Sequence, residues 1–266
     1  MNQKRKKPAP KHLTVTHTEQ ITPNMQRVRL QGDDLTKFSL DCEGGYIKLL
    51  FTSEGSTDLS TLSEGDKPLM RTYTVRRFDP DALMIELDLV RHITTDALCG
   101  FGARWAADVK VGDNVNVFGP GLRSELNKEA DWFFMTADMT ALPALTKELI
   151  HLPADAKGYA VIKVLEEQDI QTIPAPEGVQ VIWLTAEQSL AEKARELAWL
   201  EGQVSVWSAC EFSSMRELRT YFRNEKEVDR EFIYISSYWK QGVTEDGHKV
   251  IKRQDAEEQE AEENGE

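Results

Sequence analysis

The stretch Gly119-Pro120-Gly121 divides the chain into two halves whose apolar residues follow different periods. Before it, apolar and polar residues alternate, as in Leu83-Met84-Ile85-Glu86-Leu87-Asp88-Leu89. Such alternation places one face of a strand on a core and the other face in water. Turn signals such as Gly32-Asp33-Asp34 and Glu64-Gly65-Asp66 separate these runs. Short strands at this spacing predict a small antiparallel β-barrel, which we take to have six strands.

The second half of the chain predicts a parallel sheet in an α/β sandwich. Its strands are continuous apolar runs, typical of strands buried on both faces, and helical stripes lie between several of them. Ser214-x-x-Glu217 resembles a capping box at the start of one helix. Pro174 and Pro176 indicate that the crossover from 168 to 178 lacks a full helix. The predicted strands are Trp132 to Thr136, Tyr159 to Leu165, Val179 to Leu184, Val204 to Trp207 and Phe232 to Ile235.

Four segments follow from these patterns. Residues 1–12 are expected to be a disordered basic arm, residues 13–125 the barrel domain and residues 126–242 the α/β domain. Residues 243–266 form a C-terminal extension with an acidic tail, which could be helical if it docks and is otherwise solvated. Ligands of parallel α/β sheets bind outside the carboxyl ends of the strands, so we expect a cleft there.

The composition excludes several classes of function. The 266 residues carry a net charge of −13, which argues against a nucleic-acid partner. No apolar run approaches the roughly 20 residues of a membrane helix, and no secretory signal is visible. The 3 cysteines are widely spaced and match no metal-site pattern. We therefore expect a cytoplasmic protein with reduced thiols, no metal site and no membrane association.

The run Arg71-Thr72-Tyr73-Thr74-Val75-Arg76 is the first candidate site. In a strand, Arg71, Tyr73 and Val75 point to one side. An arginine, an aromatic ring and a hydroxyl so close together can hold a phosphate, stack on a planar ring and bond to its edge. The spacing alone also fits an ordinary strand with an exposed arginine and a half-buried tyrosine.

A second candidate site follows Arg91-His92, in the run Gly100-Phe101-Gly102-Ala103-Arg104-Trp105-Ala106. Glycines at the expected start of a helix leave backbone amides free to bind an anion at the positive end of the helix dipole. The alternative is a glycine turn before a short helix anchored by Trp105.

Taken in order, these motifs resemble the siderophore-interacting protein family, flavin-dependent ferric-siderophore reductases related in fold to the ferredoxin–NADP⁺ reductases. The resemblance covers roughly residues 13 to 245. It rests on Arg71-x-Tyr73-Thr74, a following histidine, the segment from Gly100 to Ala106, Gly112-Asp113 with Gly119-Pro120-Gly121, Ala137-Asp138-x-Thr140-Ala141, Ala209-Cys210-Glu211 and Tyr238-Trp239-Lys240-x-Gly242.

The resemblance implies a bound FAD. Tyr73 would stack near the isoalloxazine ring, Arg71 would hold the pyrophosphate, and Thr74 would bond close to the ring. The chain has Phe101-Gly102-Ala103 where the family usually has Pro-Ala-Ser, so phosphate binding there would depend on backbone amides. Met139 replaces a residue that is commonly acidic. The other residues implied to bind cofactor are Val75, His92, Gly100, Gly102, Ala103, Trp105, Asp138, Thr140 and Ala141.

The implied reaction is reduction of the ferric iron of a siderophore complex, because ferrous iron binds hard oxygen ligands far more weakly. Lys48, Arg123 and Lys240 would bind the ferric siderophore, although each could equally be a solvated surface residue. The electron donor would be NAD(P)H or reduced ferredoxin, and within the family a longer C-terminal segment tends to go with ferredoxin. We expect a monomer. The alternatives are a related flavin oxidoreductase with another acceptor and a siderophore carrier without redox activity.

Overall fold

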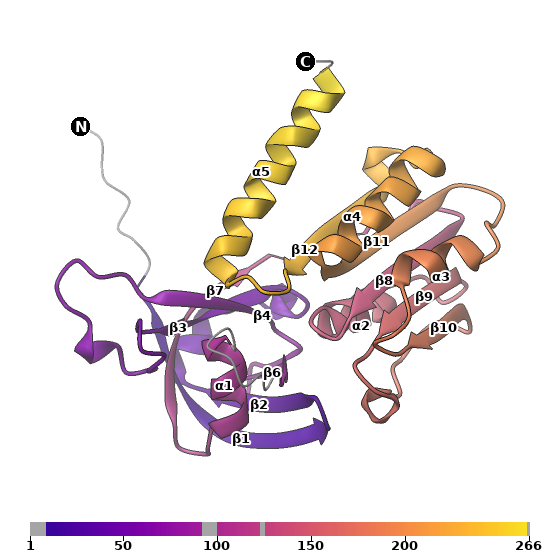
Figure 1. Cartoon of the computed structure of the whole chain (residues 1–266). Coiled ribbons are helices and arrows are strands. Elements are labelled where there is room, and N and C mark those ends of the chain that lie inside the picture. The colour runs from indigo at the N-terminus through magenta and orange to yellow at the C-terminus, as the bar shows by residue number, and fades with distance from the viewer. Residues whose placement is uncertain (1–8, 92–99, 123–125, 265–266) are drawn as a thin grey trace, which may run out of the picture. The chain divides into compact units, whose positions relative to one another are not determined.

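A computed structural model of the protein describes residues 9–91, 100–122 and 126–264. The chain forms two compact units (Figure 1). The first consists of Met1–Ile93 and Phe101–Arg123, and the second of Thr94–Gly100 and Ser124–Glu266. The predicted succession of an antiparallel β unit and a parallel α/β unit is confirmed. No helix in the described ranges is both long enough and apolar enough to cross a membrane.

The first unit is a curved antiparallel sheet with the strand order β4-β3-β7-β1-β2-β6-β5. Alternate residues of its strands, among them Val28, Leu30, Ile47 and Leu49, are completely buried in one core. The helix α1 (Phe101–Asp108) adds Ala106 to this core. The strands are β1 (Lys11–Thr22), β2 (Met25–Gln31), β3 (Tyr46–Phe51), β4 (Leu69–Thr74), β5 (Arg77–Asp79), β6 (Met84–Val90) and β7 (Asn114–Gly121).

The unit has seven strands rather than the predicted six. The chain from Leu69 to Asp79 is interrupted at Val75 and Arg76, which divides it into β4 and β5. These two strands are the opposite edges of the sheet, although only two residues separate them along the chain. The first strand begins at Lys11, which pairs with Val117, so residues 11 and 12 belong to the sheet and not to an N-terminal arm.

The polar side of β6 is not in water as the alternation predicts. Glu86 and Asp88 are only 3% and 7% exposed. Three arginines cover them: Arg29 Nε lies 2.9 Å from Glu86, Arg27 Nε lies 2.7 Å from Asp88, and Arg76 contacts both carboxylates. Burial acts to raise the pKa of Glu86, but these arginines hold it below its usual value. An ion-pair network therefore covers this face of the sheet.

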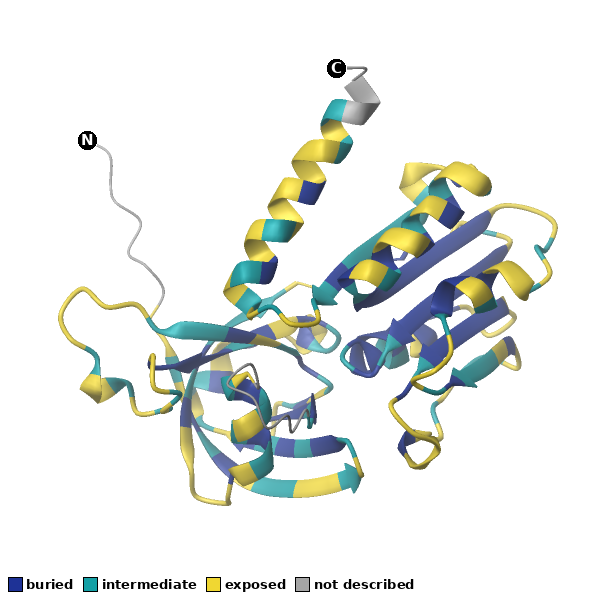
Figure 2. Ribbon diagram, viewed as in Figure 1, coloured by how far each residue is buried: buried dark blue, intermediate teal, exposed yellow. Residues whose placement is uncertain are grey.

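The second unit is a parallel sheet with the strand order β10-β9-β8-β11-β12. The three central strands are almost wholly buried, whereas the edge strands β10 and β12 are half-buried (Figure 2). The two edge runs are therefore not buried on both faces as predicted. The strands are β8 (Trp132–Asp138), β9 (Lys157–Lys163), β10 (Gly178–Leu184), β11 (Val204–Glu211) and β12 (Ile233–Trp239).

Three helices of this unit follow the predicted stripes: α2 (Leu142–Ile150), α3 (Leu190–Glu196) and α4 (Phe212–Arg219). The expected absence of a full helix before β10 is confirmed, since that crossover contains only a 3-10 turn, Glu167–Asp169. The predicted capping box at Ser214 is wrong. The helix α4 begins directly after β11, and the Glu211 carboxylate accepts the backbone N–H groups of Ser213 and Ser214.

The C-terminal extension is a docked helix, α5 (Glu245–Asn264). His248 and Asp255, at i and i+7, are buried on the same face of the helix two turns apart, and Ile251 between them packs against the core beside α4. His248 Nε2 lies 2.8 Å from Ser237 Oγ of β12, and Lys252 Nζ donates to Ser236 Oγ at 2.7 Å. The interpretation of this segment as a solvated tail is therefore wrong, and its helical alternative is correct.

Candidate functional site

The first part of the candidate site is the strand β4. Arg71 pairs with Leu49 and Tyr73 with Ile47 in the ladder to β3, so both lie on the face of the sheet that bears the core. Arg71 is 9% exposed and donates from Nη1 to the Met70 carbonyl at 2.8 Å, and Tyr73 is half-buried against the core. The alternation that the sequence predicts for Arg71, Tyr73 and Val75 is present.

The start of α1 lies against these two side chains. The Arg71 guanidinium is 5.7 Å from the centroid of the Phe101 ring, and Phe101 is the first residue of α1. A Cβ atom added to Gly102 would lie 1.9 Å from the hydroxyl oxygen of Tyr73. Only glycine allows this approach. The structure thus brings together Arg71 and Tyr73 with Phe101 and Gly102 at the start of α1.

These residues fit the phosphates of an FAD molecule. The first amides of an α-helix have no partner within the helix, so α1 offers N–H donors at its positive end. Next to them Arg71 supplies a guanidinium, the side chain best suited to hold phosphate oxygens. Among the described residues other than its chain neighbours, no atom lies within 4 Å of a Cβ atom added to Gly100. The donor set, its charge and the available room agree with a dinucleotide phosphate site that depends on amides and one arginine.

The other residues predicted in this unit have different surroundings. Thr74 is buried and pairs with Tyr46, on the face opposite to Tyr73. Val75 is completely buried, and its N–H and C=O bond to the turn at Gly44 and Gly45 at 2.8 Å, so it serves the core. Trp105 packs edge-on against Phe51 with centroids 6.5 Å apart and anchors α1. The predictions for His92 and Arg123 fall outside the described residues.

The second part of the site lies at the carboxyl ends of β8, β11 and β12, where Asp138 accepts four hydrogen bonds. Its Oδ1 accepts from Thr140 N at 2.9 Å and from Thr140 Oγ1 at 2.5 Å. Its Oδ2 accepts from Glu211 N at 2.8 Å and from Trp239 Nε1 at 2.7 Å. Burial raises the pKa of Asp138, and these donors oppose that effect by stabilising the carboxylate. Asp138 therefore joins the ends of three strands.

Sequence reasoning found Asp138, Thr140 and Ala141 but did not single out Glu211 as a structural partner. Glu211 caps α4 and also accepts from Gln241 N at 3.2 Å, which fixes the turn after β12. In that turn Lys240 Nζ lies 4.6 Å from the centroid of the Phe212 ring. A carboxylate that ends a strand and directly precedes a helix was the available signal. Ala141 is fully buried as the first residue before α2 and contributes only its backbone.

Lys48 lines a pocket on the outer face of the first unit. The pocket measures about 260 Å³ and lies over β3, β4 and β7. Lys48 pairs with Thr72, so it points to the face opposite to Arg71 and Tyr73. The lining residues are Tyr46, Lys48, Met70, Phe118, Gly119, Pro120 and Gly121.

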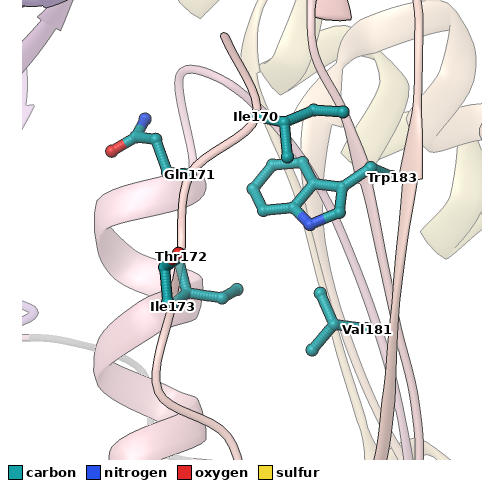
Figure 3. Close-up of a pocket in the computed structure, with 6 residues that line it drawn as sticks. All are labelled: Ile170, Gln171, Thr172, Ile173, Val181 and Trp183. Carbon is teal, nitrogen blue, oxygen red and sulfur yellow. The ribbon is translucent and has the colours of Figure 1, made fainter. Parts of the chain in front are cut away.

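A pocket of about 380 Å³ lies beside the edge strand β10 in the second unit (Figure 3). Trp183 and Val181 form one wall, and Ile170 and Ile173 of the crossover segment form the other. Trp183 is therefore half-buried, although its run, Val179 to Leu184, was predicted to be buried on both faces. The reason is its place on an edge strand, because side chains there have a neighbouring strand on one side only. Trp132 and Trp207, on central strands, are buried as predicted.

An antiparallel β unit followed by a parallel α/β unit is the fold of the ferredoxin reductase-like proteins. The fold is shared with a ferredoxin–NADP⁺ reductase from Plasmodium falciparum at a TM-score of 0.58 and 11% identity, over 86% of this chain and 96% of that one. Residues 14–124 match the model of the siderophore-interacting FAD-binding domain, and residues 130–242 match that of the siderophore-interacting protein. The chain belongs to the siderophore-interacting protein family.

Individual relatives agree with this assignment. The chain is 32% identical over 254 residues to the ferric vibriobactin reductase ViuB of Vibrio cholerae, which covers 90% of this chain and 92% of the relative. The siderophore-interacting protein SipS from Aeromonas hydrophila has a TM-score of 0.82 and 29% identity, over 93% of this chain and 98% of that one. A siderophore utilization protein from T. fusca has a TM-score of 0.75 and 30% identity, over 90% and 96% of the two chains.

Proposed function

We propose that the protein uses bound FAD to reduce the ferric iron of a siderophore complex to ferrous iron, which the siderophore then releases. Support comes from the family and from relatives named as ferric vibriobactin and ferric acinetobactin reductases. In the structure, the observation that carries the proposal is the Arg71 guanidinium 5.7 Å from the Phe101 ring at the start of α1. An arginine and helix amides that converge in this way suit a diphosphate.

The cofactor-binding residues of the first unit each have a specific role in this proposal. Arg71 and the amides from Gly100 to Ala103 hold the phosphates, Tyr73 offers its ring to the flavin, and Thr74 bonds near the ring edge. When bound, FAD supplies the exchange between a two-electron donor and iron, which takes one electron. The protein therefore needs no acid–base pair or nucleophile and has to bind, orient and shield the reactants.

The ferric siderophore is the second ligand in the proposal. Lys48, Lys240 and Arg123 supply positive charge to an anionic complex on a chain whose net charge is −13. Asp138 and Thr140 fix the turn after β8, at the carboxyl ends where nucleotide ligands of such sheets bind. For the electron donor we propose reduced ferredoxin, with NAD(P)H as the alternative. The protein would act as a cytoplasmic monomer.

Cofactor binding is tested by titrating the flavin-free protein with FAD. Arg71→Gln should weaken FAD binding strongly, because a phosphate charge loses its partner. Tyr73→Ala should cost about 1–2 kcal/mol of binding through the lost aromatic contact. Arg77→Gln, which changes an exposed arginine of β5, is the matched control and should leave the affinity unchanged. An FAD affinity that is the same in all three variants would refute the assigned site.

Activity is tested by reducing the FAD-loaded protein without oxygen, adding a ferric siderophore and trapping ferrous iron with a coloured chelator. Ferrous iron should form in proportion to the reduced flavin consumed. A carrier would bind the complex and give no ferrous iron, and a general flavin reductase would ignore changes to Lys48 or Lys240. Parallel reduction of the flavin by NADH, NADPH and ferredoxin identifies the donor.

A further inference from the structure

The ring of Phe101, the first residue of α1, is held in place by its neighbours in the first unit. A Cβ atom added to Gly55 would lie 2.5 Å from Phe101 Cδ1, so the turn at Gly55 can approach the ring only because it has no side chain. Gly55 also has a φ of +86°, which residues with a side chain rarely adopt. The centroid of the Phe51 ring is 6.4 Å from that of Phe101. The protein itself therefore fixes this ring.

Two guanidinium groups share the Phe101 ring. That of Arg71, a buried residue of β4, lies 5.7 Å from the ring centroid, and that of Arg104, an exposed residue of α1, lies 5.0 Å from it. Both distances fall within the roughly 6 Å over which an aromatic ring attracts a cation. The ring thus keeps two arginines from different elements close together, although like charges repel each other.

The position of Arg104 in α1 is unfavourable for the helix itself. The residue lies at the end of the first turn, where the helix dipole favours acidic side chains and disfavours cations. The first turn of α1 contains no acidic residue that could offset this charge. Within the described ranges, no hydrogen bond or ion pair joins Arg104 to a carboxylate. Residues that break a local rule without compensation in the fold are expected at functional sites, and here the missing partner is an anion.

We propose that Arg104 binds the adenosine-side phosphate of FAD and so makes the site prefer FAD to FMN; the inference rests on the proposed function. The diphosphate of FAD carries a negative charge on each phosphate, and a guanidinium can bond two oxygens of one of them. Arg71 shares a strand face with Tyr73, which is assigned to the flavin, so Arg71 takes the flavin-side phosphate. The exposed Arg104 takes the outer phosphate, which FMN lacks. The fixed Phe101 ring holds both guanidinium groups ready before the cofactor binds.

Titration of the flavin-free full chain with FAD, FMN and riboflavin tests this inference without any measurement of iron reduction. Arg104→Gln should lower the affinity for FAD about tenfold and change that for FMN by less than about twofold. Arg71→Gln should weaken the binding of both, because both have the flavin-side phosphate. Riboflavin has no phosphate and should bind all these proteins alike. Arg104→Lys keeps the charge and should recover part of the affinity for FAD, and Phe101→Leu should reduce the effect of Arg104→Gln.

An unchanged affinity for FAD in Arg104→Gln, or an equal loss for FAD and FMN, would overturn the inference. Arg77→Gln, at an exposed arginine of β5, controls for the change in net charge. Urea denaturation shows that each variant is folded. If Arg71→Gln weakens the binding of both flavins and Arg104→Gln weakens neither, only the role of Arg104 is wrong and the proposed function stands. If the native protein binds neither FAD nor FMN, the proposed function fails together with the inference.

Discussion

Arg219 of α4 holds Asp255 of α5 through two hydrogen bonds, from Nη1 to Oδ2 at 2.7 Å and from Nη2 to Oδ1 at 2.8 Å. The two side chains are 11% and 8% exposed. Arg216 lies 3.6 Å from the same carboxylate, and Arg223 donates to Gln259 at 3.1 Å one turn further along α5. Cations of α4 and the segment after it thus hold a helix that is otherwise strongly acidic.

Asp255→Asn should loosen α5 from the rest of its unit. The asparagine side chain has one acceptor oxygen, so it cannot accept both arginine hydrogen bonds, and the charge of Arg219 would be only half satisfied near the core. We therefore expect the free energy of docking of α5 to become about 2 kcal/mol less favourable. Hydrogen–deuterium exchange of residues 245–264 measures this loss directly. Glu257→Gln is the control, because within the described residues the ion-pair partner of Glu257 is the exposed Arg253 of the same helix. Equal exchange in the two variants would contradict the anchoring role.

The docking of α5 should also weaken in mild acid. Burial lowers the pKa of His248 below the usual value, with Lys252 and Lys240 acting in the same direction and Glu245 and Glu211 opposing them. The folded protein therefore holds a neutral imidazole, while an undocked helix takes up a proton near pH 6.5. The His248 contribution is complete above about pH 6.5 and is lost progressively as the pH falls below that value.

Hydrogen exchange of α5 at pH 7.5 and pH 5, corrected for intrinsic rates, checks this expectation. Asp255 does not confound it, because the hydrogen bond from Arg219 lowers the pKa of that carboxyl and its contribution is lost only in stronger acid. His248→Gln keeps a polar partner for Ser237 and should remove most of the pH dependence. A pH dependence of equal size in that variant would assign the effect to another group.

Much of the fold could be predicted from the sequence because its two periods are strong. The alternation in β2 and β6 and the apolar runs of β8, β9 and β11 reflect what each strand buries. The predictions that were wrong depend on tertiary partners. Glu86 and Asp88 alternate with apolar residues exactly as exposed residues do, and only the distant Arg27, Arg29 and Arg76 show why they are buried.

The sequence could predict those parts of the candidate site whose residues are near neighbours on one strand. Arg71 and Tyr73 share a face because they are two residues apart on one strand. In contrast, Glu211 and Trp239 meet Asp138 only because parallel pairing aligns three strand ends, which residue spacing does not reveal. Trp183 was misplaced for a related reason, since an apolar run does not distinguish an edge strand from a central one.

Asp138→Asn should destabilise the second unit more than Trp239→Phe does. The asparagine side chain has a single acceptor oxygen for four donors and turns an N–H toward two of them, which we expect to cost about 2–3 kcal/mol of unfolding free energy. Trp239→Phe removes one donor and should cost about 1 kcal/mol. Urea denaturation of both variants, with the exposed Asp155→Asn as control, measures the order. A larger effect for Trp239→Phe would show that indole packing and not the carboxylate joins the strand ends.

Gly102→Ala should weaken FAD binding by at least about tenfold without unfolding the protein. The added methyl group would lie 1.9 Å from the Tyr73 hydroxyl, so the tyrosine ring has to leave its place at the start of α1. Tyr73→Phe alone should have a small effect, because the ring remains. In the double variant the nearest ring atom is Cζ, at 3.0 Å from the new methyl carbon, so part of the lost affinity should return. FAD titrations of the four proteins give the coupling free energy between the two positions. If the effects of Gly102→Ala and Tyr73→Phe simply add, the methyl group does not act through Tyr73, and the cofactor contact assigned to that ring is wrong.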